Sequence, residues 1–273
     1  MTDLDLYKRF SAAILASSEA DLINDCTLGG KLTLFQTGRL SCSYAPFEFV
    51  NEKARIVLVG ITPGRRQATD ALLAYRRSMQ TGDEKTALAV AKSTASFAGA
   101  MRSNLARMFD HVGLHSILEI SSCAELFETA RSLVHYTSAL RNPVFWDGAN
   151  YSGQPKINTV PILEQVVRTS FFDEVRQLSS ALWVPLGASA EIALQMAEGA
   201  GLLENGAILR GFPHASGANA ERIAYFLETK KRSDLSSKTN PDVIDARRAS
   251  LRAAVARISG ASACANYRAK GGA

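Results

Sequence analysis

The sequence lacks any apolar run close to the roughly 20 residues that a membrane-spanning helix needs. Its first eight residues are polar and acidic, so we expect no secretory signal and a cytoplasmic location. No two cysteines form a C-x-x-C pair, which favours free thiols over a zinc or iron–sulfur site; they are Cys26, Cys42, Cys123 and Cys264. We therefore expect no metal, no cofactor and no membrane partner.

A glycine- and proline-rich loop is the clearest local pattern in the chain. The apolar run of residues 56–59 stops at Gly60 and turns through Pro63 and Gly64 into two arginines. This pattern predicts a buried parallel strand with a tight loop at its carboxyl end. Open α/β sheets bind ligands at that end. The loop matches neither the P-loop nor the G-x-G-x-x-G pattern, so it predicts another kind of site.

The chain of 273 residues, 47% of them hydrophobic, suits one large α/β domain. Apolar runs predict strands at residues 55–59, 133–140, 181–186 and 207–210. Helices are expected at residues 6–23, 68–79, 85–111, 123–132, 161–178, 188–198, 218–228 and 241–258. Alternation of the two predicts a three-layer αβα sandwich around a central, mainly parallel four-stranded sheet.

The segment of residues 141–158 is longer than a simple connection requires, and its aromatic residues argue against disorder. The net charge of +5 permits an anionic partner without requiring one. Arg65 and Arg66 stand out among the basic residues, because they adjoin the predicted ligand-binding edge.

Two loops that follow predicted strands carry a resemblance. They read Gly60-Ile61-Thr62-Pro63-Gly64-Arg65 and Pro213-His214-Ala215-Ser216-Gly217, and a parallel sheet would bring both to one edge. Together they resemble the uracil-DNA glycosylase superfamily, which carries G-x-x-P-G or G-x-x-P-Y after its first core strand and H-P-S or N-P-S after its last. Residues 184–190 and 96–114 also look like superfamily segments. We therefore expect an N-terminal extension (1–53), a uracil-DNA glycosylase-like domain (54–258) and a flexible tail (259–273).

The resemblance implies an enzyme that flips a base out of DNA and cleaves its N-glycosidic bond. His214 would donate a hydrogen bond to the departing base, although a histidine that only caps the next helix is the structural alternative. The DNA backbone would be held by Arg65, Arg66, Ser216, Gly217, Asn219 and Arg222. The base would contact Gly60, Ile61, Pro63, Gly64, Phe97, Ser138, Asn142, Phe145 and Trp146, with Tyr151 as a further stacking candidate.

The chain departs from the superfamily at four positions. Thr62 stands where relatives place Asp, Asn or Glu to activate water, and Ser138 stands where uracil-specific relatives place Asn. Ala215 replaces the proline of H-P-S, and Ala218 replaces a bulky wedge. Thr62 itself, Asp70 and Asp147 remain the candidate water activators.

These departures favour a monofunctional glycosylase for a non-standard base, and a bulky modified phage base would make it a defence enzyme. No lysine lies in the four loops to form a covalent intermediate. The alternatives are a uracil or mismatch repair glycosylase, a catalytically silent DNA-binding member, and an enzyme for a free nucleoside or nucleotide. DNA is the expected partner, and the protein is expected to be a monomer.

Overall fold

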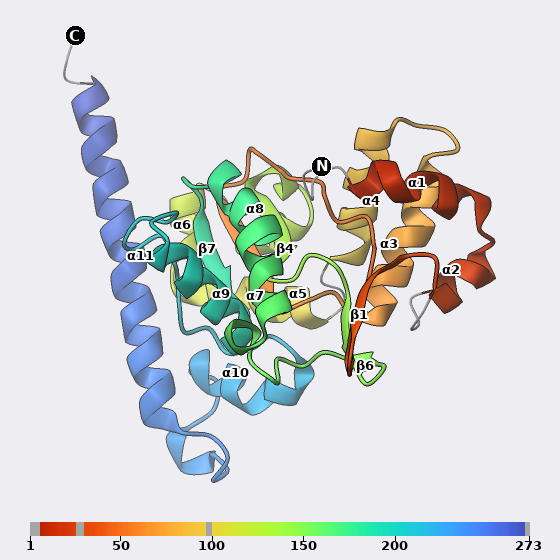
Figure 1. Cartoon of the computed structure of the whole chain (residues 1–273). Helices are drawn as coiled ribbons and strands as arrows, with labels where there is room; N and C mark the ends of the chain where they lie inside the picture. Colours follow the sequence, from red (N-terminus) through yellow and green to blue (C-terminus); the bar gives the residue numbers. More distant parts are fainter. Residues whose placement is uncertain (1–5, 26–29, 97–99, 271–273) are drawn as a thin grey trace.

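A three-stranded parallel sheet lies at the centre of the computed structural model, which describes residues 6–25, 30–96 and 100–270 (Figure 1). Its strand order is β4 (Val134–Ser138), β3 (Ile56–Gly60) and β7 (Leu182–Pro185). The predicted α/β class and the first three predicted strands are confirmed.

The prediction of a fourth strand at residues 207–210 is wrong. This segment makes one parallel bridge, between Ile208 and Trp183, with backbone hydrogen bonds of 2.8 Å on either side. Gly206 and Gly211 flank it with φ angles of 91° and 113°. The backbone thus turns on both sides of the bridge, which leaves the segment too short for a regular ladder.

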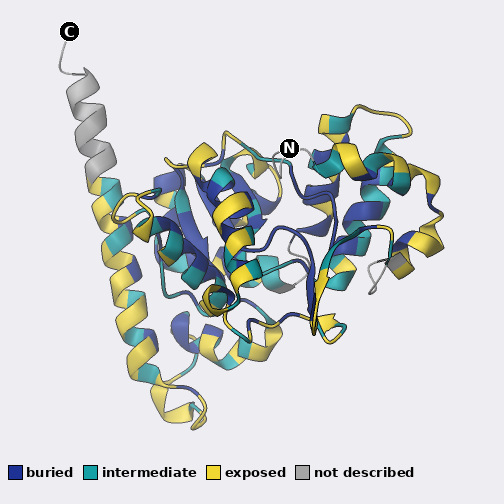
Figure 2. Ribbon diagram, viewed as in Figure 1, coloured by how far each residue is buried: buried dark blue, intermediate teal, exposed yellow. Residues whose placement is uncertain are grey.

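Helices cover both faces of the sheet. Successive side chains of a strand point to opposite faces, and those of β3 are apolar on both. Ile56 and Leu58 of β3 pack into a core formed with α5 (Ala100–His111), α6 (Leu114–Leu118), α10 (Ala220–Phe226) and α11 (Pro241–Lys270). Val57 and Val59 pack into a second core formed with α7 (Pro161–Val166), α8 (Phe172–Gln177) and α9 (Ala188–Gly199). Figure 2 shows the sheet between them as a buried layer.

A second, antiparallel sheet was not predicted. Its strand order is β1 (Thr33–Thr37), β2 (Leu40–Ser43), β5 (Val144–Trp146) and β6 (Ala149–Asn150). Leu40 pairs with Trp146, so the N-terminal segment is hydrogen-bonded to the long segment of residues 141–158.

The N-terminal helices join a third core with the helices that follow β3. Here α1 (Leu6–Ala16) and α2 (Glu19–Asp25) lie beside α3 (Arg65–Ser78) and α4 (Glu84–Ala95). Phe10, Ile14 and Tyr75 are buried together in this core. The described part of residues 1–53 is thus packed onto the α/β core.

Several helices differ from their predicted bounds. The predicted helix at 6–23 is interrupted at residues 17–18, and that at 161–178 contains a π-helical turn, η5 (Val167–Phe171). Residues 123–132 form 3-10 turns, η2 (Cys123–Phe127) and η3 (Arg131–Leu133), and α11 continues to Lys270. Further short turns are η4 (Ile157–Thr159), η6 (Gly217–Asn219) and η7 (Arg232–Asp234).

No helix among the described residues combines the length and apolar character that crossing a membrane would require.

Candidate functional site

The loops predicted to form a site meet at the carboxyl edge of the parallel sheet. Gly60 pairs with Ser138 across β3 and β4, and a Cβ on Gly60 would lie 3.4 Å from Ser138 Oγ. Gly187 follows β7 with a φ of 109°, and a Cβ on it would lie 3.7 Å from His214 Cδ2. Because β3 lies between β4 and β7, both contacts belong to one edge.

His214 is held as a neutral imidazole with a free donor. The backbone N–H of Ser216 donates to His214 Nδ1 at 3.3 Å, and Ser216 Oγ lies 3.0 Å from the same nitrogen. A backbone N–H can only donate, so Nδ1 accepts and the ring proton resides on Nε2. The residue is exposed to solvent, but the protein atoms around the ring lower its pKa by desolvation.

The predicted DNA-binding residues after His214 form one connected network. Asn219 Nδ2 donates to Ser216 Oγ at 3.2 Å, and Arg222 Nη1 donates to Asn219 Oδ1 at 2.9 Å. Gly217 begins η6 and is exposed. The network holds the His214 loop against the start of α10 and leaves its outer face open to solvent.

Thr62 has a structural place. Its hydroxyl donates to the carbonyl of Asn142 at 2.9 Å and accepts from the backbone N–H of Val144 at 3.0 Å. The hydroxyl proton is therefore in use, and a threonine is a poor general base. The buried Asn142 side chain accepts from the backbone N–H of Ala45 at 3.1 Å. These contacts give no support to the catalytic role predicted for Thr62 or the base contact predicted for Asn142.

The rest of the glycine–proline loop packs tightly against its neighbours. Pro63 is buried, and Gly64 precedes α3, where a Cβ would lie 3.3 Å from Asn150 Nδ2. Ile61 Cδ1 would lie 3.1 Å from a Cβ on Gly153. The long segment of residues 141–158 thus closes over the loop.

Two of the four aromatic residues expected to stack on a base are core residues. Phe145 is 1% exposed and Tyr151 is 2% exposed. Trp146 is partly exposed, with the Arg39 guanidinium 5.0 Å from its ring centre. Phe97 lies outside the described residues.

The charged residues predicted at the edge differ in their hydrogen bonds and ion pairs. Arg65 Nη2 donates to the carbonyl of Gly148 at 2.7 Å. The Arg66 side chain is 95% exposed, with its Nε 3.9 Å from a carboxylate oxygen of Asp70. Asp147 is ion-paired with Arg39, which lowers its pKa. The Asp70 carboxylate keeps solvent access on α3, whereas Asp147 is already paired.

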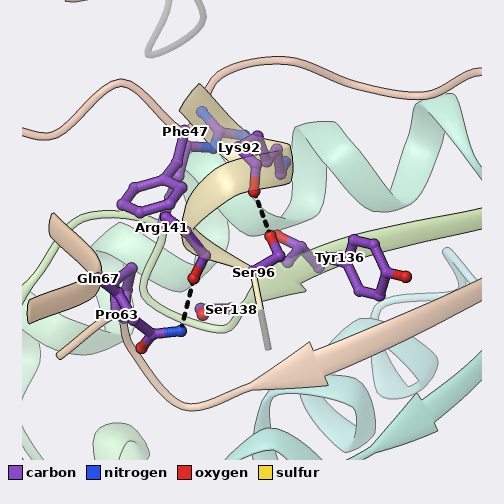
Figure 3. Close-up of a pocket in the computed structure, with 10 residues that line it drawn as sticks. Phe47, Pro63, Gln67, Lys92, Ser96, Tyr136, Ser138 and Arg141 are labelled. Carbon is purple, nitrogen blue, oxygen red and sulfur yellow. Dashed lines mark hydrogen bonds between the residues drawn. The ribbon is translucent and has the colours of Figure 1, made fainter. Parts of the chain in front are cut away.

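A narrow cavity of about 40 Å³ opens beside Pro63 and the end of β4 (Figure 3). It holds a few water molecules, which is less than a nucleobase needs. Gln67 fixes one wall, because its side chain accepts from the backbone N–H of Gly64 at 3.0 Å and donates to the carbonyl of Ala95 at 3.0 Å. The lining is Phe47, Pro63, Gln67, Lys92, Ala95, Ser96, Tyr136, Thr137, Ser138 and Arg141.

A buried polar cluster lies behind this cavity and was missed by sequence analysis. Its centre is Glu174, which accepts from Thr137 Oγ1 at 2.8 Å, Lys92 Nζ at 3.1 Å and Arg141 Nη2 at 3.4 Å. His135 Nε2 also contacts its carboxylate. Sequence spacing gives no signal for the cluster, because its members come from α4, from β4 and the segment after it, and from α8, which lie far apart in the sequence.

Burial and charge set the protonation states of this cluster. Burial alone would raise the pKa of Glu174, but Lys92 and Arg141 hold it well below its usual range. Burial and the Lys92 charge lower the pKa of His135 to about 4, so the imidazole is neutral. Lys92 donates to Glu174 and, at 2.7 Å, to the carbonyl of Phe49. Its ammonium is thus bound within the protein although the residue lines the cavity.

Glu48 adds a buried carboxyl group, 5% exposed, which interacts with the buried Tyr44 hydroxyl. Burial raises its pKa to about 7. The pKa of Glu48 in the folded protein exceeds its unfolded value of 4.5. Its contribution to the free energy of unfolding is therefore fully present below pH 4.5 and is lost as pH rises towards 7. The unmodified protein should therefore lose up to about 3 kcal/mol of its free energy of unfolding as pH rises, and Glu48→Gln should remove this loss. Urea unfolding at pH 5 and pH 8 measures it.

The matched control is Glu164→Gln, which changes a half-buried glutamate paired with the exposed Arg168. It should leave the pH dependence of the unfolding free energy as in the unmodified protein. A Glu48→Gln protein with the same difference between pH 5 and pH 8 would contradict the raised pKa.

Among the described residues, no three His, Cys, Asp or Glu side chains gather in a way that could hold a metal ion. Cys42 and Cys123 are buried as thiols.

Comparison with known proteins gives one informative relationship. No protein-family model matches the chain, and no solved structure matches it. The Bacillus subtilis (strain 168) protein described as "Uncharacterized protein YoxB" is 34% identical over 232 residues, which are 84% of this chain and 89% of the relative. At this identity and coverage the chain belongs to the same family as YoxB.

Proposed function

We propose that the protein is a monofunctional DNA glycosylase that removes a non-standard or modified base and leaves an abasic site. The observation that carries this proposal is the state of His214. A neutral imidazole with its Nδ1 occupied by the Ser216 N–H offers Nε2–H as a donor, at the edge where α/β sheets bind ligands.

The proposed chemistry needs a donor of this kind. Cleavage of the N-glycosidic bond leaves negative charge on the departing base and positive charge on the sugar. A donor that is already in place stabilises the base anion without reorganising. Because the pKa of His214 is lowered, the imidazole stays neutral at physiological pH and donates without releasing its proton.

The surfaces beside His214 suit the flanking phosphates. Ser216, Asn219 and Arg222 form a polar network on one side, and the exposed Arg66 lies at the start of α3 on the other. Such groups contact phosphate in sequence-independent binding. A base flipped between them would enter beside Pro63 and Ser138, and the cavity there must widen to admit it.

The base is proposed to differ from uracil. Ser138, beside Gly60, occupies the position where uracil-specific relatives place Asn, and the Thr62 hydroxyl is bound to backbone. A bulky modified base of phage DNA fits the small residues at these positions and would make the protein a defence enzyme. Water attack without a carboxylate in this loop would rely on charge stabilisation, which can carry much of a barrier.

The Thr62 hydroxyl is hydrogen-bonded to the backbone, which also favours a second candidate, a DNA-binding protein without catalysis. A panel of duplexes separates the two: uracil, hypoxanthine, a thymine mispair, and hydroxymethylated and glucosylated cytosine, each followed by alkali cleavage of abasic sites. Strand cleavage that His214→Ala abolishes supports the glycosylase. Salt-sensitive binding without abasic product on any duplex supports the silent binding protein. Brisk release of uracil with no release of modified bases would overturn the proposed substrate class.

A further inference from the structure

We propose that Asp147 masks a DNA-binding arginine, Arg39, and that a DNA phosphate takes the place of the Asp147 carboxylate when DNA binds. This inference rests on the proposed function, because it assumes that DNA lies across the candidate site. It adds a contact surface outside the loops that carry the candidate chemistry, on the second sheet.

The two residues meet at a tight turn. Asp147 and Gly148 connect β5 to β6 with φ angles of 49° and 74°. Arg39, which directly precedes β2, donates from Nε to Asp147 Oδ2 at 2.6 Å. Its guanidinium also lies 5.0 Å from the ring centre of Trp146, so the ring holds the cation in place.

The turn is attached directly to the candidate site. Arg65 reaches the turn as well, because it donates to the carbonyl of Gly148 at 2.7 Å. Arg65 follows Gly64, and its backbone N–H donates to Asn150 Oδ1 at 3.0 Å. Figure 1 places β6 and α10, which follows the His214 loop, on the same lower side of the body. DNA bound across that edge would therefore pass Arg39.

The ion pair is easily exchanged. The Arg39 side chain is 63% exposed and that of Asp147 is 49% exposed. An ion pair in solvent contributes little to stability, so a phosphate can replace the carboxylate at small cost. The exchange leaves Arg39 over Trp146 and moves Asp147 away from the anion. Asp147 therefore acts as an internal competitor of phosphate.

The test compares two charge-equivalent variants, Asp147→Asn and Asp173→Asn, in binding to a fluorescent duplex. Asparagine tolerates the positive φ at residue 147. Asp173 forms an exposed pair with Arg176 on α8, away from β6 in Figure 1, so it controls for net charge. Asp147→Asn should tighten binding about twofold to fivefold, and Asp173→Asn should leave it unchanged. Arg39→Gln should weaken binding and lower the salt slope by about one.

Tryptophan fluorescence locates the contact without any reference to catalysis. The chain has two tryptophans, and Trp183 is fully buried. DNA should quench the protein's emission, and Trp146→Phe should abolish the quenching while duplex binding persists. Equal affinities of the Asp147→Asn and Asp173→Asn variants, or DNA binding with no quenching, would overturn the masking proposal alone. Absence of DNA binding by the unmodified protein at low salt would overturn both proposals.

Discussion

Glu174→Ala is expected to destabilise the folded protein by about 3–5 kcal/mol. The substitution leaves Lys92 and Arg141, which are 4% and 3% exposed, without the carboxylate between them. Two uncompensated cations in the protein interior cost far more than the lost contacts. Urea unfolding at pH 7 measures the change.

The control is Glu164→Ala, which removes a half-buried glutamate on α7 that is paired with the exposed Arg168. Because its pair with Arg168 lies in solvent, it should cost less than about 1 kcal/mol. A Glu174→Ala protein as stable as the Glu164→Ala protein would show that the cluster is hydrated rather than buried.

The same cluster sets how the protein responds to acid. The pKa of His135 is lowered from 6.5 to about 4. Its contribution to the free energy of unfolding is therefore present above pH 6.5 and is lost as pH falls towards 4. Glu48 acts in the opposite direction, because its contribution is lost as pH rises from 4.5 to 7. The two opposed effects flatten the pH dependence between about 4.5 and 6.5, and Glu48→Gln should expose the acid sensitivity that His135 causes.

The parts of the fold that were predicted correctly have a local signal in the sequence. The strands β3 and β7 are apolar runs that end at Gly60 and Gly187, and the parallel ladder brings their loops to one edge. The second sheet has no such local signal, because Leu40 pairs with Trp146 across more than a third of the chain. Strands of two to five residues are too short for an alternating pattern to reveal them.

The site residues divide in the same way. The position of His214 follows from its place after the last strand-like segment, but its tautomer depends on the hydrogen bond from the Ser216 N–H, which the sequence does not reveal. Phe145 was predicted to stack on a base and is buried instead, because aromatic rings contribute large areas to the core wherever the chain closes on itself. Glu174 was missed because a charged residue on a helix usually faces solvent.

His214→Ala is expected to lower the single-turnover rate of base excision by about 10²–10³-fold, the loss found when one fixed donor to a developing anion is removed. The substrate is the base that the duplex panel identifies, and DNA affinity should stay within about twofold, since neutral His214 makes no ion pair with phosphate.

Two further measurements separate this role from a structural one. Ser216→Ala removes the hydroxyl but keeps the backbone N–H that holds His214 Nδ1, so excision should persist at a reduced rate. Because the pKa of His214 is lowered, any change in the excision rate caused by its protonation should begin at a lower pH than for an ordinary histidine. A rate that rises as pH falls through 6.5 would require imidazolium as the donor, and an unchanged rate in His214→Ala would remove His214 from the reaction altogether.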